Sequence, residues 1–278
     1  MSAPHITRIV TCHRQWPLLA RWLRESSLRQ EGVEWLVVND APDDPPQPEL
    51  AALLSDLAAR LVTPDFNRGR SGARNLGVSE AVGLFCEHID GDDMPLPLAP
   101  EVFRLLDSRV DLVLFPVLEW DGTGDVPLDG AAETRTIKPA WSAFLPNLSP
   151  ADVRPAGTIW RRESFLRLGG YDARFEGSED LQLAWRADRA GVQIVRCNSP
   201  KQIYVKQPGG SERDRLFTEG HRRLWEWLEG RVNREAANQR RLWLGKDVLQ
   251  GAGWACRDLY RHHRAVTFFA QSVIHKLF

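Results

Sequence analysis

The chain has 278 residues, of which 43% are hydrophobic, enough for a sizeable core and for one large or two small domains. Its 36 Lys and Arg residues nearly balance its 37 Asp and Glu residues, which excludes the overall basic field that nucleic-acid binding needs. The 4 cysteines form no CxxC pair, so we expect neither a zinc site nor a disulfide framework. The first residues lack a signal-peptide core, and no run approaches about 18 apolar residues. We therefore expect a cytoplasmic protein.

Short β-branched runs alternate with helix-patterned segments in the first third of the chain. We expect strands at residues 5–11, 33–38, 60–63 and 84–89, and helices at residues 16–28, 49–60 and 71–83. This alternation predicts an α/β fold with a mainly parallel sheet and crossover helices. Such sheets bind ligands beyond the carboxyl ends of their strands. Asn39-Asp40 and the run from Asp90 to Asp93 both follow predicted strands, so we expect them at one edge of the sheet.

The remainder of the chain changes character twice. We expect a strand at residues 111–118, a loop or lid over the Pro/Gly/Asp-rich residues 120–155, an amphipathic helix at 178–191 and a late strand at 192–197. From Ser211 onward, amphipathic helices rich in Arg, Trp and Leu follow, with 13 Lys and Arg against 8 Asp and Glu. This local excess of positive charge marks the last part as a separate helical region.

Three aspartates stand within four positions in "CEHIDGDDMPLP", residues 86–97. In an extended segment Asp90 and Asp92 point to one side, while Asp93 points away. Two carboxylates on one side suit a hard divalent cation whose other ligands are water and phosphate oxygens. The alternative is an acidic turn that caps the next helix. The cluster alone leaves both interpretations open.

The sequence around this cluster resembles glycosyltransferase family 2, the inverting enzymes of the GT-A fold. The resemblance covers roughly residues 5–211. It rests on the stretch "NRGRSGARNLGVSEAVGLFCEHIDGDDMPLP", on "VVNDAPDD", and on the acceptor-like stretch "GTIWRRESFLRLGGYDARFEGSEDLQLAWRADRAG". It implies a GT-A catalytic domain over residues 1–210, divided into a nucleotide-sugar half (1–97) and an acceptor half (98–210). Residues 211–278 would form a helical C-terminal region.

For the donor, the resemblance implies that Asp40 accepts a hydrogen bond from the nucleotide base and that Thr11 lines the same pocket. Arg74 would lie near the base and the diphosphate, where a rigid guanidinium suits planar or anionic groups. The alternatives are a turn aspartate, a strand threonine and a solvated helix arginine.

For the cofactor, the resemblance implies that Asp92 is the main ligand of Mn²⁺ or Mg²⁺. Asp90 would touch the metal or the ribose, and Asp93 would orient the ligands without touching the metal. The cation would act as a Lewis acid on the departing nucleoside diphosphate.

For the acceptor, the resemblance implies that Asp180 is the catalytic base. We expect the positive end of its helix to keep Asp180 ionised at neutral pH. Glu179 and Trp160 would bind the acceptor, since Trp rings stack on the apolar faces of sugars; Trp120 and Trp141 lie in the same part of the sequence. The alternative for Glu179 is a favourable acid in the first turn of a helix.

The chain departs from the family at Gln207. Family members often carry a histidine there that contacts metal or diphosphate, so that contact is in doubt. None of the 7 histidines falls in a metal-like pair, and we expect them at the surface.

The resemblance implies transfer of a sugar from a nucleotide-sugar donor, with UDP-sugars first, to a hydroxyl of a glycan or lipid-linked acceptor in bacterial surface polysaccharide synthesis. The alternatives are a nucleotide-sugar-binding protein without catalysis and a sugar nucleotidyltransferase. A dehydrogenase is disfavoured because no G-x-G-x-x-G follows the first strand. The C-terminal helices would contact the inner face of the membrane, cap the catalytic domain or form a homodimer contact.

Overall fold

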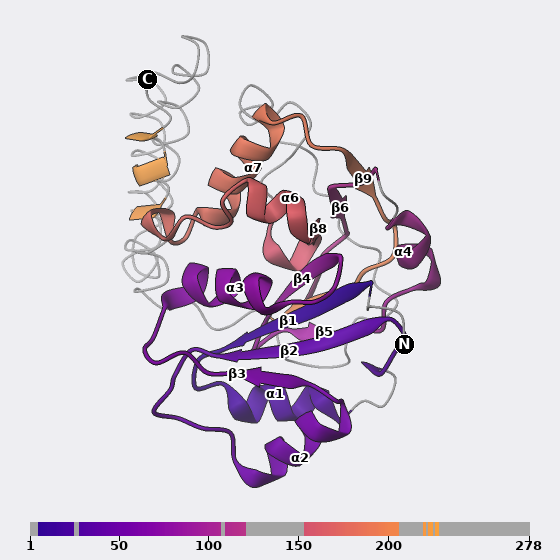
Figure 1. Cartoon of the computed structure of the whole chain (residues 1–278), viewed down its shortest axis with the longest axis vertical. Coiled ribbons are helices and arrows are strands. Elements are labelled where there is room, and N and C mark those ends of the chain that lie inside the picture. The colour runs from indigo at the N-terminus through magenta and orange to yellow at the C-terminus, as the bar shows by residue number, and fades with distance from the viewer. Residues whose placement is uncertain are drawn as a thin grey trace, which may run out of the picture.

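The computed structural model describes residues 5–24, 28–106, 109–120 and 153–205, with residues 219–220, 222–224 and 226–227 of the C-terminal region. Within these ranges a central sheet lies between two layers of helices (Figure 1). This arrangement confirms the predicted α/β fold class. Gln207 and Trp141 lie outside the described residues, as does most of the predicted C-terminal helical region.

The central sheet has seven strands, in the spatial order β3 (Arg60–Val62), β2 (Val33–Asn39), β1 (Ile6–Cys12), β4 (Phe85–Asp90), β8 (Thr158–Arg161), β6 (Leu112–Leu114) and β9 (Ile194–Arg196). The pairs among β1 to β4 are parallel, as the alternation predicted, and β6 pairs with β9 in parallel. Within the described part of the central sheet, only β8 runs antiparallel to its neighbours, β4 and β6. It therefore joins the two halves of the sheet.

Helices cover both faces of the sheet (Figure 1). The helices α1 (Trp16–Leu23) and α2 (Pro48–Asp56) lie on one face, and α3 (Gly69–Glu80), α6 (Arg162–Arg167) and α7 (Glu179–Arg189) lie on the other. Strand β1 shows how the sequence supports both layers, because neighbouring side chains point to opposite faces. Ile9 packs in the cluster beside α3, and Val10 packs in the cluster beside α1 and α2.

The helix α3 approaches the sheet closely at Gly77. A Cβ atom on this residue would lie 2.2 Å from Cγ2 of Ile9, so no larger side chain fits without displacing the helix. This close approach holds α3, with the site residues that it carries, against β1 and β2.

A second, three-stranded sheet was not expected. It consists of β5 (Met94–Pro95), β10 (Gln202–Val205) and β7 (Leu118–Trp120). The single strand predicted at 111–118 is wrong, because the chain leaves the central sheet after β6 and enters the second sheet at β7. Pro116 lies in this break and cannot donate a backbone hydrogen bond to a ladder. The remaining short helix, α4 (Pro100–Leu105), packs in the apolar cluster beside β6.

The described part of the C-terminal region lies against α7 and the segment before it. Leu224 is buried in the cluster beside α7, and the ring of Trp227 packs edge-on at 4.9 Å from the ring of Trp185 and 5.6 Å from that of Phe175. This contact resembles the predicted cap over the catalytic domain. No helix within the described ranges is both long enough and apolar enough to cross a bilayer.

Candidate active site

The ends of three parallel strands bring the predicted donor residues to one edge of the sheet. In the strand register Thr11 pairs with Asp90, and Cys12 pairs with Asn39, the residue before Asp40. The Thr11 hydroxyl lies 3.4 Å from Oδ1 of Asp90. The prediction that these residues share one edge is therefore confirmed, and its cause is the aligned carboxyl ends of parallel strands.

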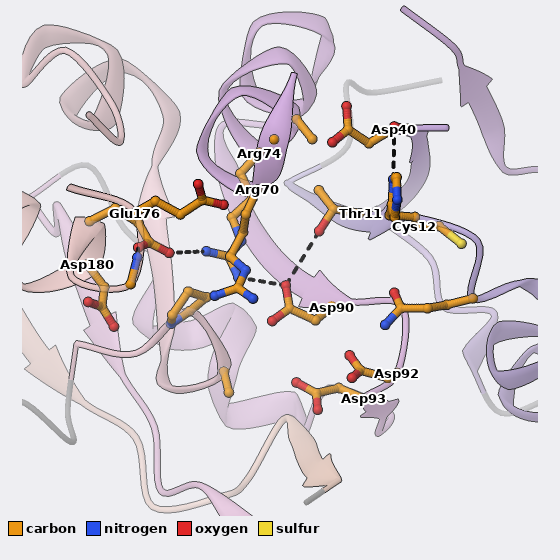
Figure 2. A pocket seen from close by; sticks show the side chains of 18 of the residues that line it. Thr11, Cys12, Asp40, Arg70, Arg74, Asp90, Asp92, Asp93, Glu176 and Asp180 are labelled. Carbon is orange, nitrogen blue, oxygen red and sulfur yellow. Dashed lines mark hydrogen bonds and ion pairs between the residues drawn. The ribbon is translucent and has the colours of Figure 1, made fainter. Parts of the chain in front are cut away.

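A pocket of about 780 Å³ opens over this edge (Figure 2). Eight of the nine residues predicted for the site line it: Thr11, Asp40, Arg74, Asp90, Asp92, Asp93, Glu179 and Asp180. The pocket therefore brings together residues from both halves of the sequence.

The aspartate cluster is a tight turn and not the extended segment that we expected. The backbone N–H of Asp93 donates to the carbonyl of Asp90 at 2.9 Å. Asp90 and Asp92 face the pocket, whereas the carboxylate of Asp93 is buried and accepts hydrogen bonds from Gln202 and from the backbone of Val205. Burial, with the charges of Asp90 and Asp92, raises the pKa of Asp93 well above its usual range.

Arg74 bridges the β4 side and the α7 side of the pocket. Its guanidinium donates to Oδ1 of Asp90 at 2.6 Å and to Oε1 of Glu179 at 2.9 Å. The side chain is only 2% exposed. Burial alone would lower the pKa of Arg74, but the two carboxylates outweigh it and raise this pKa. Figure 2 shows Asp90 and Asp180 on opposite sides of this arginine.

Asp180 begins α7 beside Glu179. The backbone N–H of Leu181 donates to Oδ1 of Asp180 at 2.7 Å, and the N–H of Gly177 donates to Oε2 of Glu179 at 2.7 Å. Burial, and then the charge of Glu179, raise the pKa of Asp180 to about 7. The expectation that the helix end keeps Asp180 fully ionised is therefore wrong. Near neutral pH this carboxyl can both take up and release a proton.

Asp40 lies at the other end of the pocket. Its side chain is buried, and Oδ1 accepts a hydrogen bond from the backbone N–H of Arg68 at 2.7 Å. Burial raises the pKa of Asp40 above its ordinary value. The side-chain amide of Asn67 donates to the Asp40 carbonyl at 2.9 Å, so the loop before α3 is fastened to the end of β2.

Trp160 is the one predicted site residue that the structure places elsewhere. Its side chain is 1% exposed, it packs in the core against Phe165, and it does not line the pocket. The prediction that it stacks on an acceptor sugar is wrong, because β8 lies inside the sheet with both faces covered. Trp120 is also buried, in contact with Trp22. His88 is buried as well, between Phe165 and Tyr171, which corrects the expectation of a surface histidine.

Sequence reasoning missed several other residues that line the pocket, among them Arg70, Arg154 and Tyr204. Arg70 is exposed, makes no ion pair with any residue that the structure describes, and helps Arg74 to lower the pKa of Asp90. Its spacing of four residues from Arg74 on one helix was a usable signal. Arg154 donates to Glu119 at 3.2 Å and lies over the ring of Tyr204. No local sequence pattern predicted the contact between Arg154 and Tyr204.

A divalent cation fits the side of the pocket where Asp90 and Asp92 lie. Seven carboxylates line the pocket against three arginines. Asp90 and Asp92 would hold the cation; no cluster of three or more His, Cys, Asp or Glu side chains within the described ranges is arranged as a protein-only metal site. Two carboxylates suit a cation that also binds phosphate oxygens.

The fold and the pocket define an α/β protein of the GT-A class. The family model for glycosyl transferase family 2 matches residues 7–127. The chain is similar to this family over that stretch.

Two bacterial relatives are biosynthesis proteins. The chain is 33% identical to the succinoglycan biosynthesis protein ExoO of Rhizobium meliloti (strain 1021) over 164 residues, which cover 58% of the chain and 45% of the relative. It is 27% identical to the O-antigen biosynthesis protein RfbC of Myxococcus xanthus over 184 residues, which cover 64% of the chain and 14% of that relative. The chain therefore matches less than half of the length of either protein.

Solved structures share the fold at low identity. TarS 1-349 of S. aureus in complex with UDP-GlcNAc has a TM-score of 0.58 and 17% identity, and the match covers 92% of this chain and 74% of that one. The mannosyltransferase PcManGT of Pyrobaculum calidifontis in complex with GDP-Man and Mn²⁺ has a TM-score of 0.59 and 16% identity, with 100% and 82% covered.

Proposed function

We propose that the chain is a metal-dependent inverting glycosyltransferase that moves a sugar from a nucleotide-sugar donor to an acceptor hydroxyl. One observation carries this proposal: Asp90 and Asp92 line the same pocket as Asp180, with Arg74 between the two sides. A donor carboxylate pair and a separate acceptor carboxylate are what such a transfer requires. The complexes of two structural neighbours with UDP-GlcNAc and with GDP-Man and Mn²⁺ support a nucleotide-sugar donor.

On the donor side, Asp40 would accept a hydrogen bond from the base, and Thr11 would line the same part of the pocket. Asp92 and Asp90 would hold Mn²⁺ or Mg²⁺, and Asp93 would fix the turn that carries them. When bound, the cation supplies Lewis-acid stabilisation to the departing nucleoside diphosphate. Arg74 would keep Asp90 ionised and in place. UDP-sugars are our first choice of donor.

On the acceptor side, Asp180 would take the proton of the attacking hydroxyl. The hydroxyl oxygen then forms its bond to the anomeric carbon while the bond from that carbon to the diphosphate oxygen breaks. The electron pair of the broken bond leaves with the nucleoside diphosphate, and the configuration at the anomeric carbon inverts. A single base suffices, since no covalent glycosyl-enzyme forms. Glu179, fixed by Arg74 and Gly177, would contact the acceptor and position Asp180.

The acceptor in this proposal is a glycan or lipid-linked saccharide of bacterial surface polysaccharide synthesis. The succinoglycan and O-antigen biosynthesis relatives support this choice. Residues 1–210 would form the catalytic domain and residues 211–278 the helical region. We place the protein in the cytoplasm, with peripheral contact to the inner face of the membrane or a homodimer contact through the helical region.

Thermal unfolding with a panel of nucleoside diphosphates, with and without Mn²⁺, tests the donor site. UDP with Mn²⁺ should stabilise the wild type by about 2.7 kcal/mol at 100 times the Kd. Asp92→Ala should abolish this shift, and Asp56→Asn, on the exposed face of α2, should retain it. A wild type that no nucleoside diphosphate stabilises in the presence of Mn²⁺ would contradict the proposal. Binding without any sugar transfer would favour the non-catalytic alternative.

A further inference from the structure

A network of buried, hydrogen-bonded polar groups lies behind the aspartate turn, outside the pocket. Arg8 on β1, Glu87 on β4 and Lys201 beside β10 all have side chains that are 0% exposed. The Arg8 guanidinium donates to both oxygens of Glu87, at 2.7 and 2.9 Å, and the Lys201 ammonium donates to Oε1 of Glu87 at 3.2 Å. Three charges are therefore desolvated together, which is costly unless each of them is paired.

This buried network continues to the aspartate turn through Gln202. The Lys201 ammonium donates to Oε1 of Gln202 at 2.8 Å, and Nε2 of Gln202 donates to Oδ2 of Asp93 at 3.0 Å. An ammonium group has no acceptor, so it can face only the oxygen of the amide. The orientation of the Gln202 amide follows from this, and its N–H must face Asp93. The backbone N–H of Val205 donates to the other carboxylate oxygen, Oδ1, at 3.1 Å.

Both donors to Asp93 come from the same strand, β10, which pairs with β5 directly after the aspartate turn. Arg8 also donates to the carbonyls of Leu96, at 2.8 Å, and Lys201, at 3.1 Å. An apolar core could hold these strands together, but it could not present a donor of fixed orientation to Asp93. The hydrogen bonds of this buried network thus end at the turn that carries Asp90 and Asp92.

We propose that Gln202, oriented by Lys201 and the Arg8–Glu87 pair, is a positioning residue for the aspartate turn and so for divalent-dependent donor binding. This inference rests on the proposed function. Gln202 does not line the pocket. It acts through Asp93. Without this hydrogen bond, repulsion from the carboxylates of Asp90 and Asp92 would turn the Asp93 side chain away from them.

Gln202→Glu tests the inference most sharply. The new carboxylate keeps an acceptor for Lys201 but replaces the donor that faces Asp93. The matched control is Gln30→Glu, because Gln30 lies away from the pocket and its amide also both donates and accepts a hydrogen bond. Nε2 of Gln30 donates to the Leu98 carbonyl at 2.8 Å, and the backbone N–H of Leu98 donates to Oε1 of Gln30 at 2.7 Å. Calorimetry would give the affinity for UDP with Mn²⁺, and ligand-observed NMR the affinity for uridine without metal.

We expect Gln202→Glu to weaken UDP binding in Mn²⁺ by about 10- to 100-fold, as loss of a group that orients metal ligands does. Uridine binding should stay as in the wild type, and Gln30→Glu should change neither affinity. Wild-type affinity of Gln202→Glu for UDP with Mn²⁺ would overturn the inference, and so would an equal loss for uridine and UDP. A wild type that binds no nucleoside diphosphate with Mn²⁺ would overturn the proposed function first.

Lys201→Met keeps the inference testable if Gln202→Glu does not fold. The Arg8–Glu87 pair remains intact in this variant, but the Gln202 amide can rotate. A smaller loss of UDP affinity in Mn²⁺, again without loss for uridine, is expected. Unchanged UDP affinity in a folded Lys201→Met protein would contradict the proposed orienting role.

Discussion

Replacing Asp180 by asparagine removes the proposed base while preserving the size of the side chain. Asp180→Asn should bind the donor and Mn²⁺ as the wild type does but transfer the sugar about 10² to 10⁴ times more slowly, the usual contribution of a positioned base. The matched control is Asp188→Asn on the same helix, because Asp188 does not line the pocket. Initial rates at saturating donor and metal measure the effect. Near-normal turnover of Asp180→Asn would refute the assignment.

The pKa of Asp180 also predicts the pH profile of the wild type. Burial and the charge of Glu179 raise this pKa to about 7, and only the ionised carboxylate can accept a proton. The rate constant for transfer should therefore reach a plateau above about pH 7 and fall roughly tenfold per pH unit below it. Asp188→Asn should show the same profile. A wild-type profile that is flat from pH 5 to pH 8 would contradict the role of Asp180.

The same raised pKa has a consequence for stability. Asp180 binds its proton more tightly in the folded chain than at the ordinary pKa of 3.8. Its contribution to stability is thus fully present below about pH 4 and is lost as the pH rises through about 7. Because asparagine does not titrate, Asp180→Asn should be more stable than the wild type at pH 8, by on the order of a few kcal/mol. A melting-temperature difference that is the same at pH 4 and pH 8 would refute this reasoning.

Three further changes probe the pocket and its surroundings. Arg70→Ala should weaken UDP binding but not uridine binding, with a difference that shrinks at high salt because the side chain is exposed; equal effects on both ligands would contradict this. Arg74→Gln should cost about 3–5 kcal/mol in urea unfolding, because it leaves the buried Glu179 without its partner, whereas a change below about 1 kcal/mol would contradict the bridging role. The intact chain should float with anionic vesicles at low salt and not at high salt, and no association at low salt would remove the proposed membrane contact.

The sequence was informative where a local pattern determines the structure. Apolar strands separated by helices predicted the parallel sheet, and residues that follow a strand, such as Asp40 and Asp90, were placed correctly at one edge.

The sequence was uninformative where distant segments determine the structure. Trp160 lies on a strand that is covered on both faces, and no pattern within four residues reveals its neighbours β4 and β6. The pKa of Asp180 depends on burial by the completed pocket and on Glu179, not on the helix end alone. Gln202 is 109 residues away from Asp93 in the chain, so only the folded structure pairs them.

The anomeric configuration of the first sugar product tests the central proposal most directly. Proton NMR can follow a UDP-sugar with an α-linked anomeric carbon, incubated with the wild type and diamagnetic Mg²⁺. The attacking hydroxyl comes from either an acceptor saccharide or water. Direct attack aided by Asp180 predicts that the β product forms first and that Asp180→Asn forms it far more slowly. An α product formed first by the wild type would contradict inverting transfer.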